Sequence, residues 1–286
     1  DLYSTHLLEM FAAGEHAAFL AAGGRPLRPR LARALALAAL APGLAVVDVG
    51  CGRGEAALHA ARRGTIVTAV DFSPGSLALV RETLEVGLSG CPVPVPPRLL
   101  RADATALPLT DGSADRVLLL DVVEHLHPWQ LSGALAEARR ILRPGGHVVI
   151  HTLPNRWAMG VAYPVLRALA APGLPADARS PYERVVHVNE QSPATMAQAL
   201  AEAGLEHRVW VEEWTTRHAA RASGREFPDA ARAEGYRWLR RPLGRRLARL
   251  AMATPLAPFV GNDIFALAWH RGSPAPPTGG RWLRVR

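Results

Sequence analysis

The chain has 286 residues, a formal net charge of +8 at pH 7 and a hydrophobic content of 49%. This length supports one well-packed domain with sizeable insertions, or at most two domains, and the composition excludes disordered and fibrous proteins. All 33 basic residues are Arg, and a pI near 10.7 permits contact with nucleic acid or an anionic membrane without by itself indicating either.

Cysteine content and hydropathy indicate the compartment. Two cysteines, Cys51 and Cys91, are too few for a disulfide framework or a thiolate zinc site, so we expect a reducing, cytoplasmic setting and no metal site. The longest apolar stretch, residues 35–47, is interrupted by a Pro-Gly pair and is too short to span a bilayer. The first ten residues, DLYSTHLLEM, carry no basic segment and predict no signal peptide.

Strand-like and helix-like segments alternate along the first half of the chain. In order, we expect a helix over 27–40, a strand over 44–50, a helix over 55–63, a strand over 65–71 and a helix over 73–86. After a Pro-rich connection, we expect strands over 97–103 and 114–121, a helix over 128–142 and a strand over 147–153. This alternation predicts βαβ units and therefore an α/β, Rossmann-like, doubly wound fold with a mostly parallel sheet.

The alternation breaks after Asn155 and resumes near the C-terminus. We expect two insertions, over 155–190 and 214–258, and between and after them a helix over 192–203 and strands over 206–213 and 263–270. The last strand completes a seven-stranded sheet and is expected to be antiparallel. The predicted organisation is an N-terminal helical cap (1–43), one domain (44–270) and a tail (271–286).

The segment VVDVGCGRGE (46–55) is the most informative motif. Its alternating glycines lack Cβ atoms, so the backbone can turn sharply after the strand and allow a ligand to approach closely. A dinucleotide-binding turn carries GxGxxG and holds a pyrophosphate. Here Asp48 precedes the first glycine by two residues, which is unfavourable for a pyrophosphate and suits a zwitterionic or cationic ligand.

Acidic residues also end the strands that follow. Asp71 ends the second strand, where a carboxylate accepts hydrogen bonds from ribose hydroxyls, and Phe72 is placed to stack on an adenine. Asp103, followed by Ala104, ends the third strand, and Asp121 ends the fourth. All of these lie at the carboxyl edge of the expected sheet, where open α/β folds bind ligands.

The set of motifs resembles the class I S-adenosylmethionine-dependent methyltransferases, especially the small-molecule branch that includes the ubiquinone-type methyltransferases. The matching segments cover roughly 40–155 and are VVDVGCGRGE, AVDFSPGSL, RADATALPLTDGSADRV, DVVEHL and LRPGGHVVIHTLPN. The resemblance implies S-adenosylmethionine as cofactor.

Cofactor contacts also follow from the resemblance. Asp48 and the loop of Gly50, Cys51, Gly52 and Gly54 would hold the amino-acid portion of the cofactor. Asp71 would hold the ribose, Asp103 and Ala104 the adenine, and Asp121 would lie close to the sulfonium methyl. The loop departs from the family's pattern at Cys51 and Arg53, at positions that vary freely.

Candidate acceptor-side residues follow the fourth and fifth strands. Glu124 and His125 are candidate catalytic groups, with His125 as a general base because its ordinary pKa lies near neutrality; the alternative is that they only shape the turn. His187 joins them if the first insertion folds over the sheet edge as a lid. The candidate acceptor pocket comprises His151, Asn155, Trp157, Tyr163, Tyr182 and Glu190. For His151 a core role is an equal alternative, and for the aromatic residues the alternative is packing of the insertion.

The function predicted from these residues is methyl transfer to an oxygen or nitrogen, less favourably a carbon, of a small-molecule acceptor. Alternatives are a cofactor-binding protein without catalysis and a nicotinamide-dependent oxidoreductase, which the DxGxGxG spacing disfavours. An Arg-rich segment, 236–261, predicts either a basic amphipathic helix that contacts the inner membrane or, as we favour, a helix packed on the domain. Nucleic-acid binding is disfavoured because no recognition module is present.

Overall fold

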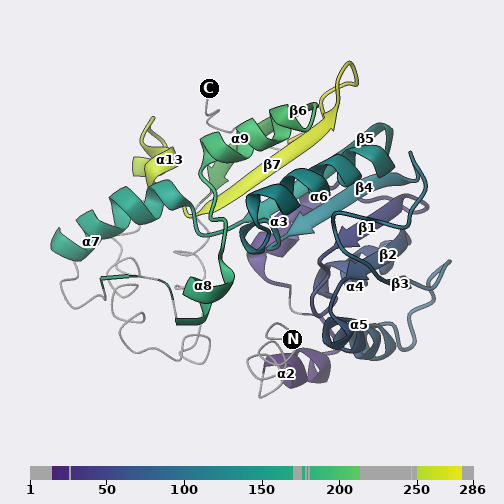
Figure 1. The fold of residues 1–286 in the computed structure, drawn as a ribbon. Helices are drawn as coiled ribbons and strands as arrows, with labels where there is room; N and C mark the ends of the chain where they lie inside the picture. Colours follow the sequence, from purple (N-terminus) through teal and green to yellow (C-terminus); the bar gives the residue numbers. More distant parts are fainter. Residues whose placement is uncertain are drawn as a thin grey trace.

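The computed structural model describes residues 15–25, 27–169, 176–177, 179, 181–212, 246 and 250–278. Figure 1 shows a central sheet with helices on both of its faces. A smaller group, comprising α7 (Tyr163–Leu169), α8 (Pro181–Val186) and α13 (Ala257–Val260), lies beyond the end of the sheet. The predicted second insertion (214–258) and the tail (271–286) fall largely outside the described residues.

The sheet has seven strands in the order β3-β2-β1-β4-β5-β7-β6. The strands are β1 (Ala45–Val49), β2 (Ile66–Asp71), β3 (Arg98–Arg101), β4 (Ala114–Leu120), β5 (Leu142–Thr152), β6 (Leu205–Glu212) and β7 (Asp263–His270). β7 runs antiparallel to both β5 and β6, and the other neighbours are parallel. The predicted α/β fold and the antiparallel last strand are therefore confirmed.

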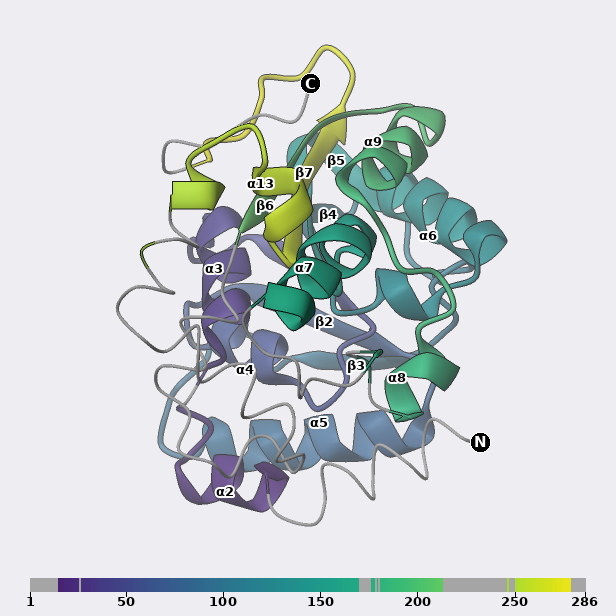
Figure 2. The same cartoon turned by 90° about the vertical axis from the view of Figure 1, so that its left-hand side faces the viewer.

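Helices cover the two faces of the sheet unequally (Figure 2). On one face lie α3 (Pro29–Leu37), α4 (Glu55–Ala61) and α5 (Pro74–Gly87), with α2 (Glu15–Ala21) outside α5; on the other lie α6 (Pro128–Ile141) and α9 (Pro193–Glu202). Each strand divides its side chains between the two cores. In β4, Leu118 and Leu120 pack beneath α3 and α4, whereas Val117 and Leu119 pack beneath α6, as the alternation of a strand requires.

Two helices begin where the sequence predicts. Ser73 accepts a hydrogen bond from the backbone of Ser76 at the start of α5, and Ser192 accepts one from Thr195 at the start of α9. In both cases Pro occupies the first helical turn, where its missing N–H costs nothing. These caps fix where the chain leaves the sheet edge and returns along its faces.

The fifth strand begins earlier than predicted. The Arg-Pro-Gly-Gly sequence ends α6 at Ile141, but Leu142 already pairs with Ala114 of β4. The register then shifts before His147 pairs with Arg116, so these residues form an irregular start of β5 and not a loop. A side chain at Gly146 would place its Cβ 2.7 Å from the backbone oxygen of Asp115, which explains why the irregular segment carries a glycine there.

The first insertion is partly described. It contains the π-helical turn Ala158–Ala162, α7 and α8. None of the helices in the described ranges is both long and apolar enough to cross a membrane.

Candidate functional site

The glycine loop between β1 and α4 is held against the neighbouring strand. The backbone N–H groups of Gly50 and Cys51 both donate to the carbonyl oxygen of Val70 in β2. Gly50, Gly52 and Gly54 have φ angles of 70°, 53° and 84°, in the left-handed region that favours glycine. A Cβ at Gly52 would meet nothing within 4 Å, whereas one at Gly50 would lie 2.5 Å from Val122. The loop is therefore closely packed at Gly50 and faces open space at Gly52.

Asp48 lies under this loop as a buried acid. Its side chain is 2% exposed, and no hydrogen-bond partner for Oδ2 is found in the described part of the chain. Burial, with the nearby charge of Asp71, raises the pKa of Asp48 to about 7. A buried carboxyl in this state gains from a ligand that brings a positive charge or an N–H donor.

Asp71 connects the loop to the end of β2. Its carboxylate accepts hydrogen bonds from the backbone N–H groups of Gly52, at 3.1 Å, and Ser73, at 2.9 Å. Burial raises the pKa of Asp71, and these hydrogen bonds oppose the shift. A carboxylate has about four acceptor positions, so further donors such as a pair of ribose hydroxyls can still bind. The next side chain, Phe72, is 50% exposed.

The third acid lies on the surface. Asp103 is exposed, and its Oδ1 accepts from both the backbone N–H and the hydroxyl of Thr105, each at 2.8 Å. Ala104 beside it is half-buried. These bonds orient the carboxylate at the same sheet edge as Asp71.

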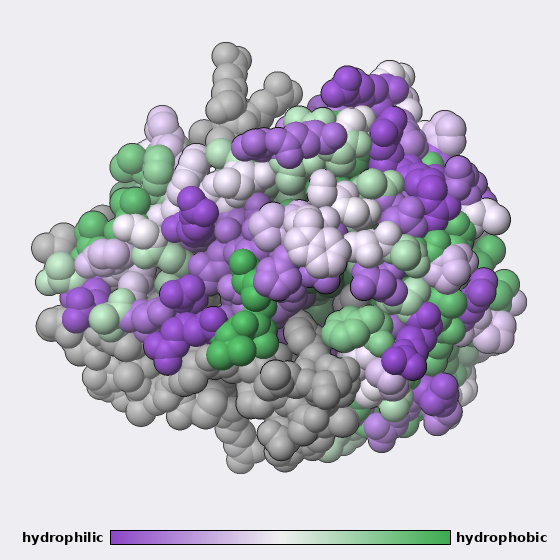
Figure 3. Space-filling view, in the orientation of Figure 1, coloured by the Kyte–Doolittle hydropathy of each residue, from purple (hydrophilic) through white to green (hydrophobic). Residues whose placement is uncertain are grey.

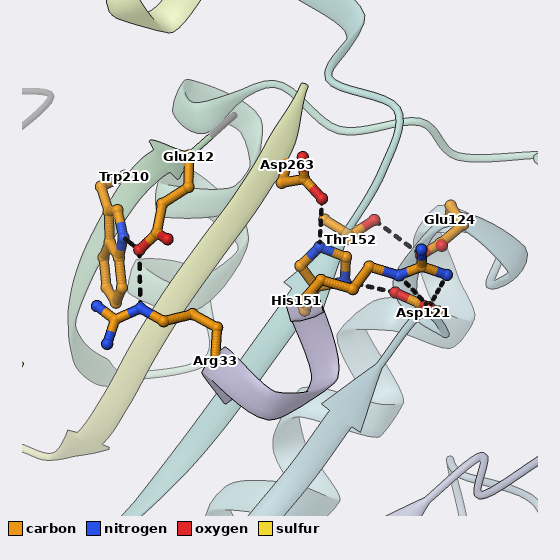
Figure 4. A network of polar contacts seen from close by, with 9 residues as sticks. Arg33, Asp121, Glu124, His151, Thr152, Trp210, Glu212 and Asp263 are labelled. Carbon is orange, nitrogen blue, oxygen red and sulfur yellow. Dashed lines mark hydrogen bonds and ion pairs between the residues drawn. The ribbon is translucent and has the colours of Figure 1, made fainter. Parts of the chain in front are cut away.

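The fourth acid belongs to a network that the sequence did not predict (Figure 4). Asp121 has a φ of 58°, a left-handed conformation that Asp tolerates. Its Oδ2 accepts from Arg30 at 2.9 Å, and its Oδ1 lies against Nδ1 of His151. Nε2 of His151 lies 3.1 Å from Oδ1 of Asp263 in β7. Four residues from four distant segments thus form one chain of alternating charges.

The network sets the charges of its members. Burial alone would lower the pKa of His151, but the carboxylates of Asp121 and Asp263 overcome it and raise the pKa to about 9. Burial would raise the pKa of Asp121, yet Arg30 and His151 hold it well below its usual range. At neutral pH the imidazolium and Asp121 are therefore both charged. No short-range sequence signal identifies Arg30 or Asp263, because their partners are far away along the chain.

Glu124, His125 and His187 come together, as the lid hypothesis requires. The Glu124 side chain is 2% exposed, and its Oε2 accepts from the Thr152 hydroxyl at 2.7 Å. Burial, and next the charge of Asp121, raises its pKa to about 8. The His125 and His187 rings meet edge to face, with centroids 4.9 Å apart. Burial, with the neighbouring His187, lowers the pKa of His125 to about 4, which weakens it as a general base.

The predicted pocket residues have different surroundings. His151 is fully buried within the network described above, which matches the alternative of a core histidine. Asn155 is also fully buried, and its side-chain nitrogen donates to the carbonyls of Pro258 and Gly261, which attaches α13 to the insertion. Neither side chain is exposed toward an acceptor.

The aromatic candidates and Glu190 lie in the insertion. Trp157 stacks on Phe259 with ring centroids 5.1 Å apart, as the packing alternative predicts. Tyr163 begins α7 and is half-buried, whereas the side chain of Tyr182 lies outside the described residues. Glu190 accepts from Arg179 at 3.3 Å and lies 3.9 Å from Nδ1 of His187.

Apolar side chains accompany this group at the surface. Val185 in α8 and Val188 after it are 66% and 41% exposed. Figure 3 shows hydrophobic atoms over α8 among hydrophilic neighbours. The site thus combines a polar edge with an apolar rim.

Part of the chain is similar in sequence to known methyltransferases. A family model described as a methyltransferase domain matches residues 47–150. The chain is 35% identical over 124 residues to demethylmenaquinone methyltransferase from Thermus thermophilus, covering 42% of this chain and 53% of that protein. It is 33% identical over 130 residues to ubiquinone biosynthesis O-methyltransferase from Alkalilimnicola ehrlichii, covering 44% and 48%.

A solved structure resembles the whole fold. Geranyl diphosphate methyltransferase in complex with GPP and sinefungin superposes with a TM-score of 0.54 at 20% identity, covering 84% of this chain and 75% of that one. At this identity the likeness concerns the fold alone. The chain spans about half the length of the curated relatives that it matches.

Proposed function

We propose that this protein is a methyltransferase. The proposal starts from residues 47–150, which form a class I methyltransferase domain with S-adenosylmethionine as cofactor, as the sequence predicts. On this premise the chain transfers a methyl group from S-adenosylmethionine to an oxygen or nitrogen atom of a small-molecule acceptor. Carbon is the less favoured acceptor atom. The buried, unpartnered Oδ2 of Asp48 beneath an open glycine loop carries the proposal.

The residues of the sheet edge fit the cofactor's groups. Asp48 accepts from and compensates the ammonium of its amino-acid portion, and Asp71 accepts from the ribose hydroxyls while its bonds to Gly52 and Ser73 keep it in place. Phe72, half exposed at the end of β2, offers a face for the adenine, next to Asp103 and Ala104. The open space above Gly52 admits a ligand that a larger side chain would exclude.

The protein's contribution to the chemistry is positioning. When bound, S-adenosylmethionine supplies an electrophilic methyl group on a sulfonium that is its own leaving group. The chain must then align the acceptor with the S–CH3 bond and exclude water, which lowers the barrier without a covalent intermediate. Asp121 is held at the end of β4 by Arg30 and His151, so its carboxylate would stay fixed beside the methyl group of a bound cofactor.

The acceptor binds beyond β4, between Glu124, His125 and His187 and the apolar side chains of α8. This region supports an acceptor with a polar reacting end and an apolar body. Two relatives are named for quinone biosynthesis, so hydroxylated quinols are the first acceptors to test.

Calorimetric titration with S-adenosylhomocysteine and with NAD tests the cofactor. We expect binding of S-adenosylhomocysteine alone; binding of NAD alone would support the oxidoreductase alternative and refute the proposal. Methyl transfer is then tested with methyl-labelled S-adenosylmethionine and a cell extract, followed by a panel of quinols, phenols and amines. Cofactor binding with no labelled product from any source would favour a non-catalytic role.

The compartment is proposed as cytoplasmic. Peripheral contact with the inner membrane through 236–261 stays a second proposal, because half of that segment lies outside the described residues. Sedimentation with anionic vesicles, compared with neutral ones, distinguishes the two.

A further inference from the structure

A group of three metal-ligating side chains lies on the acceptor side of the site. In the described part of the chain, Glu124, His125 and His187 form one group whose ligand atoms all lie within 4.8 Å of one another. An ion with bonds of about 2.1 Å separates tetrahedral ligands by about 3.4 Å. The ligand atoms therefore need to approach one another by at most about 1.4 Å for an ion to bind.

The backbone already joins the two segments that carry the group. Glu124 and His125 lie in the short helical turn after β4, and His187 follows α8 in the insertion. Asn189 donates its backbone N–H to the carbonyl oxygen of Glu124 at 3.1 Å. The ring of His125 reaches the carbonyl oxygen of Val186, also at 3.1 Å. These contacts hold the histidines together before any ion binds.

The hydrogen bonds also orient the candidate ligands. A carbonyl oxygen only accepts, so Nδ1 of His125 carries the proton and Nε2 carries the lone pair; this is how metal-binding histidines are usually supported. The Thr152 hydroxyl donates to Oε2 of Glu124, and a carboxylate has further acceptor positions with which it can bind an ion. Glu190 lies 3.9 Å from Nδ1 of His187, and Arg179 holds it there.

We propose that Glu124, His125 and His187 bind a divalent transition-metal ion. Two imidazoles and one carboxylate suit Zn²⁺, Fe²⁺ or Mn²⁺ better than Ca²⁺ or Mg²⁺, which prefer all-oxygen ligand sets. Three protein ligands leave positions open for water or a substrate, as in catalytic metal sites. The proposal departs from the sequence prediction of no metal site, which grouped these three residues only as catalytic candidates.

The role of the ion rests on the proposed function. Bound here, it takes the oxygen of an acceptor hydroxyl as a ligand and lowers the hydroxyl pKa, so that the proton leaves to solvent. The acceptor oxygen then forms its bond to the methyl carbon as the S–CH3 bond breaks, and S-adenosylhomocysteine leaves. The substrate class is therefore an acceptor with a metal-binding hydroxyl, such as a hydroxylated aromatic ring.

Metal binding is tested without cofactor or acceptor. The full chain is stripped with a chelator, dialysed and titrated with Co²⁺, whose visible absorption reports its ligands, and then with Zn²⁺ as competitor. We expect about one Co²⁺ per chain, displaced by Zn²⁺. The His187→Gln and Glu124→Gln variants should weaken binding by at least about 100-fold, more than the loss of a supporting partner.

A matched control separates the site from a general effect of histidine loss. His207 lies in β6, away from the proposed ligands, and its ring lies 3.4 Å from the carbonyl oxygen of Leu205 in the same strand. His207→Gln should bind Co²⁺ as the parent does, and circular dichroism should show all variants folded. Failure of the parent to bind either ion, or unchanged binding in folded His187→Gln, would overturn the site. A chain that binds Co²⁺ but not S-adenosylhomocysteine refutes the proposed function and leaves the metal site standing.

Discussion

The acidic residues on the two sides of the sheet edge have different kinds of partner. On the β1–β2 side, Asp48 and Asp71 receive mainly backbone N–H donors, and burial raises the pKa of both. On the β4–β5–β7 side, Asp121 pairs with Arg30 and His151, which hold its pKa well below its usual range. In the described part of the chain no cation forms an ion pair with Asp48 or Asp71, whereas Asp121 pairs with both Arg30 and His151.

This difference indicates what each half does. A buried acid without a cation is suited to receive one from a ligand, whereas an acid already paired inside the protein is suited to hold structure. Loss of an acid should therefore affect binding on the first side and folding on the second. The following changes test that contrast.

Asp121→Asn should cause the largest loss of stability. It removes the carboxylate that pairs with Arg30 and leaves His151 with Asp263 as its remaining carboxylate; breaking a buried pair in this way costs about 3–5 kcal/mol. Asn also tolerates the left-handed backbone at this position, where φ is 58°, so backbone strain does not confuse the result. Urea unfolding measures the change.

The control for this variant is Asp111→Asn. Asp111 pairs with Arg140 at 2.7 Å, but its side chain is 80% exposed, and exposed pairs contribute less than about 1 kcal/mol. Equal losses in the two variants would show that the buried network has no special role in stability.

Gly50→Ala should be the next most severe change, although it lies on the binding side. A left-handed Ala costs about 1–2 kcal/mol, and the clash of its Cβ with Val122, at 2.5 Å, adds about 1–3 kcal/mol. Gly52→Ala is the matched variant, because its φ of 53° adds strain but its Cβ meets open space.

These two glycines should separate folding from binding. Thermal unfolding should show a larger loss of stability for Gly50→Ala than for Gly52→Ala. Titration with S-adenosylhomocysteine should show a clear loss of affinity for Gly52→Ala, despite its smaller loss of stability. Normal binding by Gly52→Ala would mean that the open space above the loop is not the cofactor site.

The pH dependence of stability tests the charge of His151. The folded-state pKa of about 9 exceeds the ordinary 6.5, so the contribution is fully present below pH 6.5 and is lost as pH rises toward 9. Its size is at most about 3 kcal/mol. Asp48 and Glu124, whose pKa values are raised to about 7 and 8, also make stability fall with rising pH, but mostly below pH 8.

The variant His151→Gln isolates this contribution. Chemical unfolding from pH 6 to pH 9.5 should show a steeper fall in the parent than in the variant, with the greatest difference in slope between pH 6.5 and pH 9. Parallel curves would show that His151 is neutral in the folded protein.

The same contrast explains how much the sequence could predict. Asp48, the glycine loop and Asp71 lie within one βαβ unit, so strand ends and spacing were enough to place them together. The network around Asp121 could not be predicted, because its members are far apart in the chain. Arg30 comes from α3, and Asp263, which contacts His151, comes from β7. His187 was predicted to approach the edge as part of a lid. Its contact with His125 depends on how the insertion packs, which no local pattern encodes.

Asp71→Ala should have the smallest effect of these changes, and the effect should be specific to cofactor binding. The change removes the carboxylate that we propose accepts from the ribose hydroxyls, and the loss of charged hydrogen bonds should weaken S-adenosylhomocysteine binding by about 1–3 kcal/mol. Calorimetric titration measures this, with Asp103→Ala as a comparison at an exposed acid of the same edge. Because Asp71 also accepts from Gly52 and Ser73, the unfolding free energy of the variant must be measured alongside. If affinity is unchanged while stability falls, Asp71 behaves like Asp121, and the division of the edge into a binding half and a structural half is wrong.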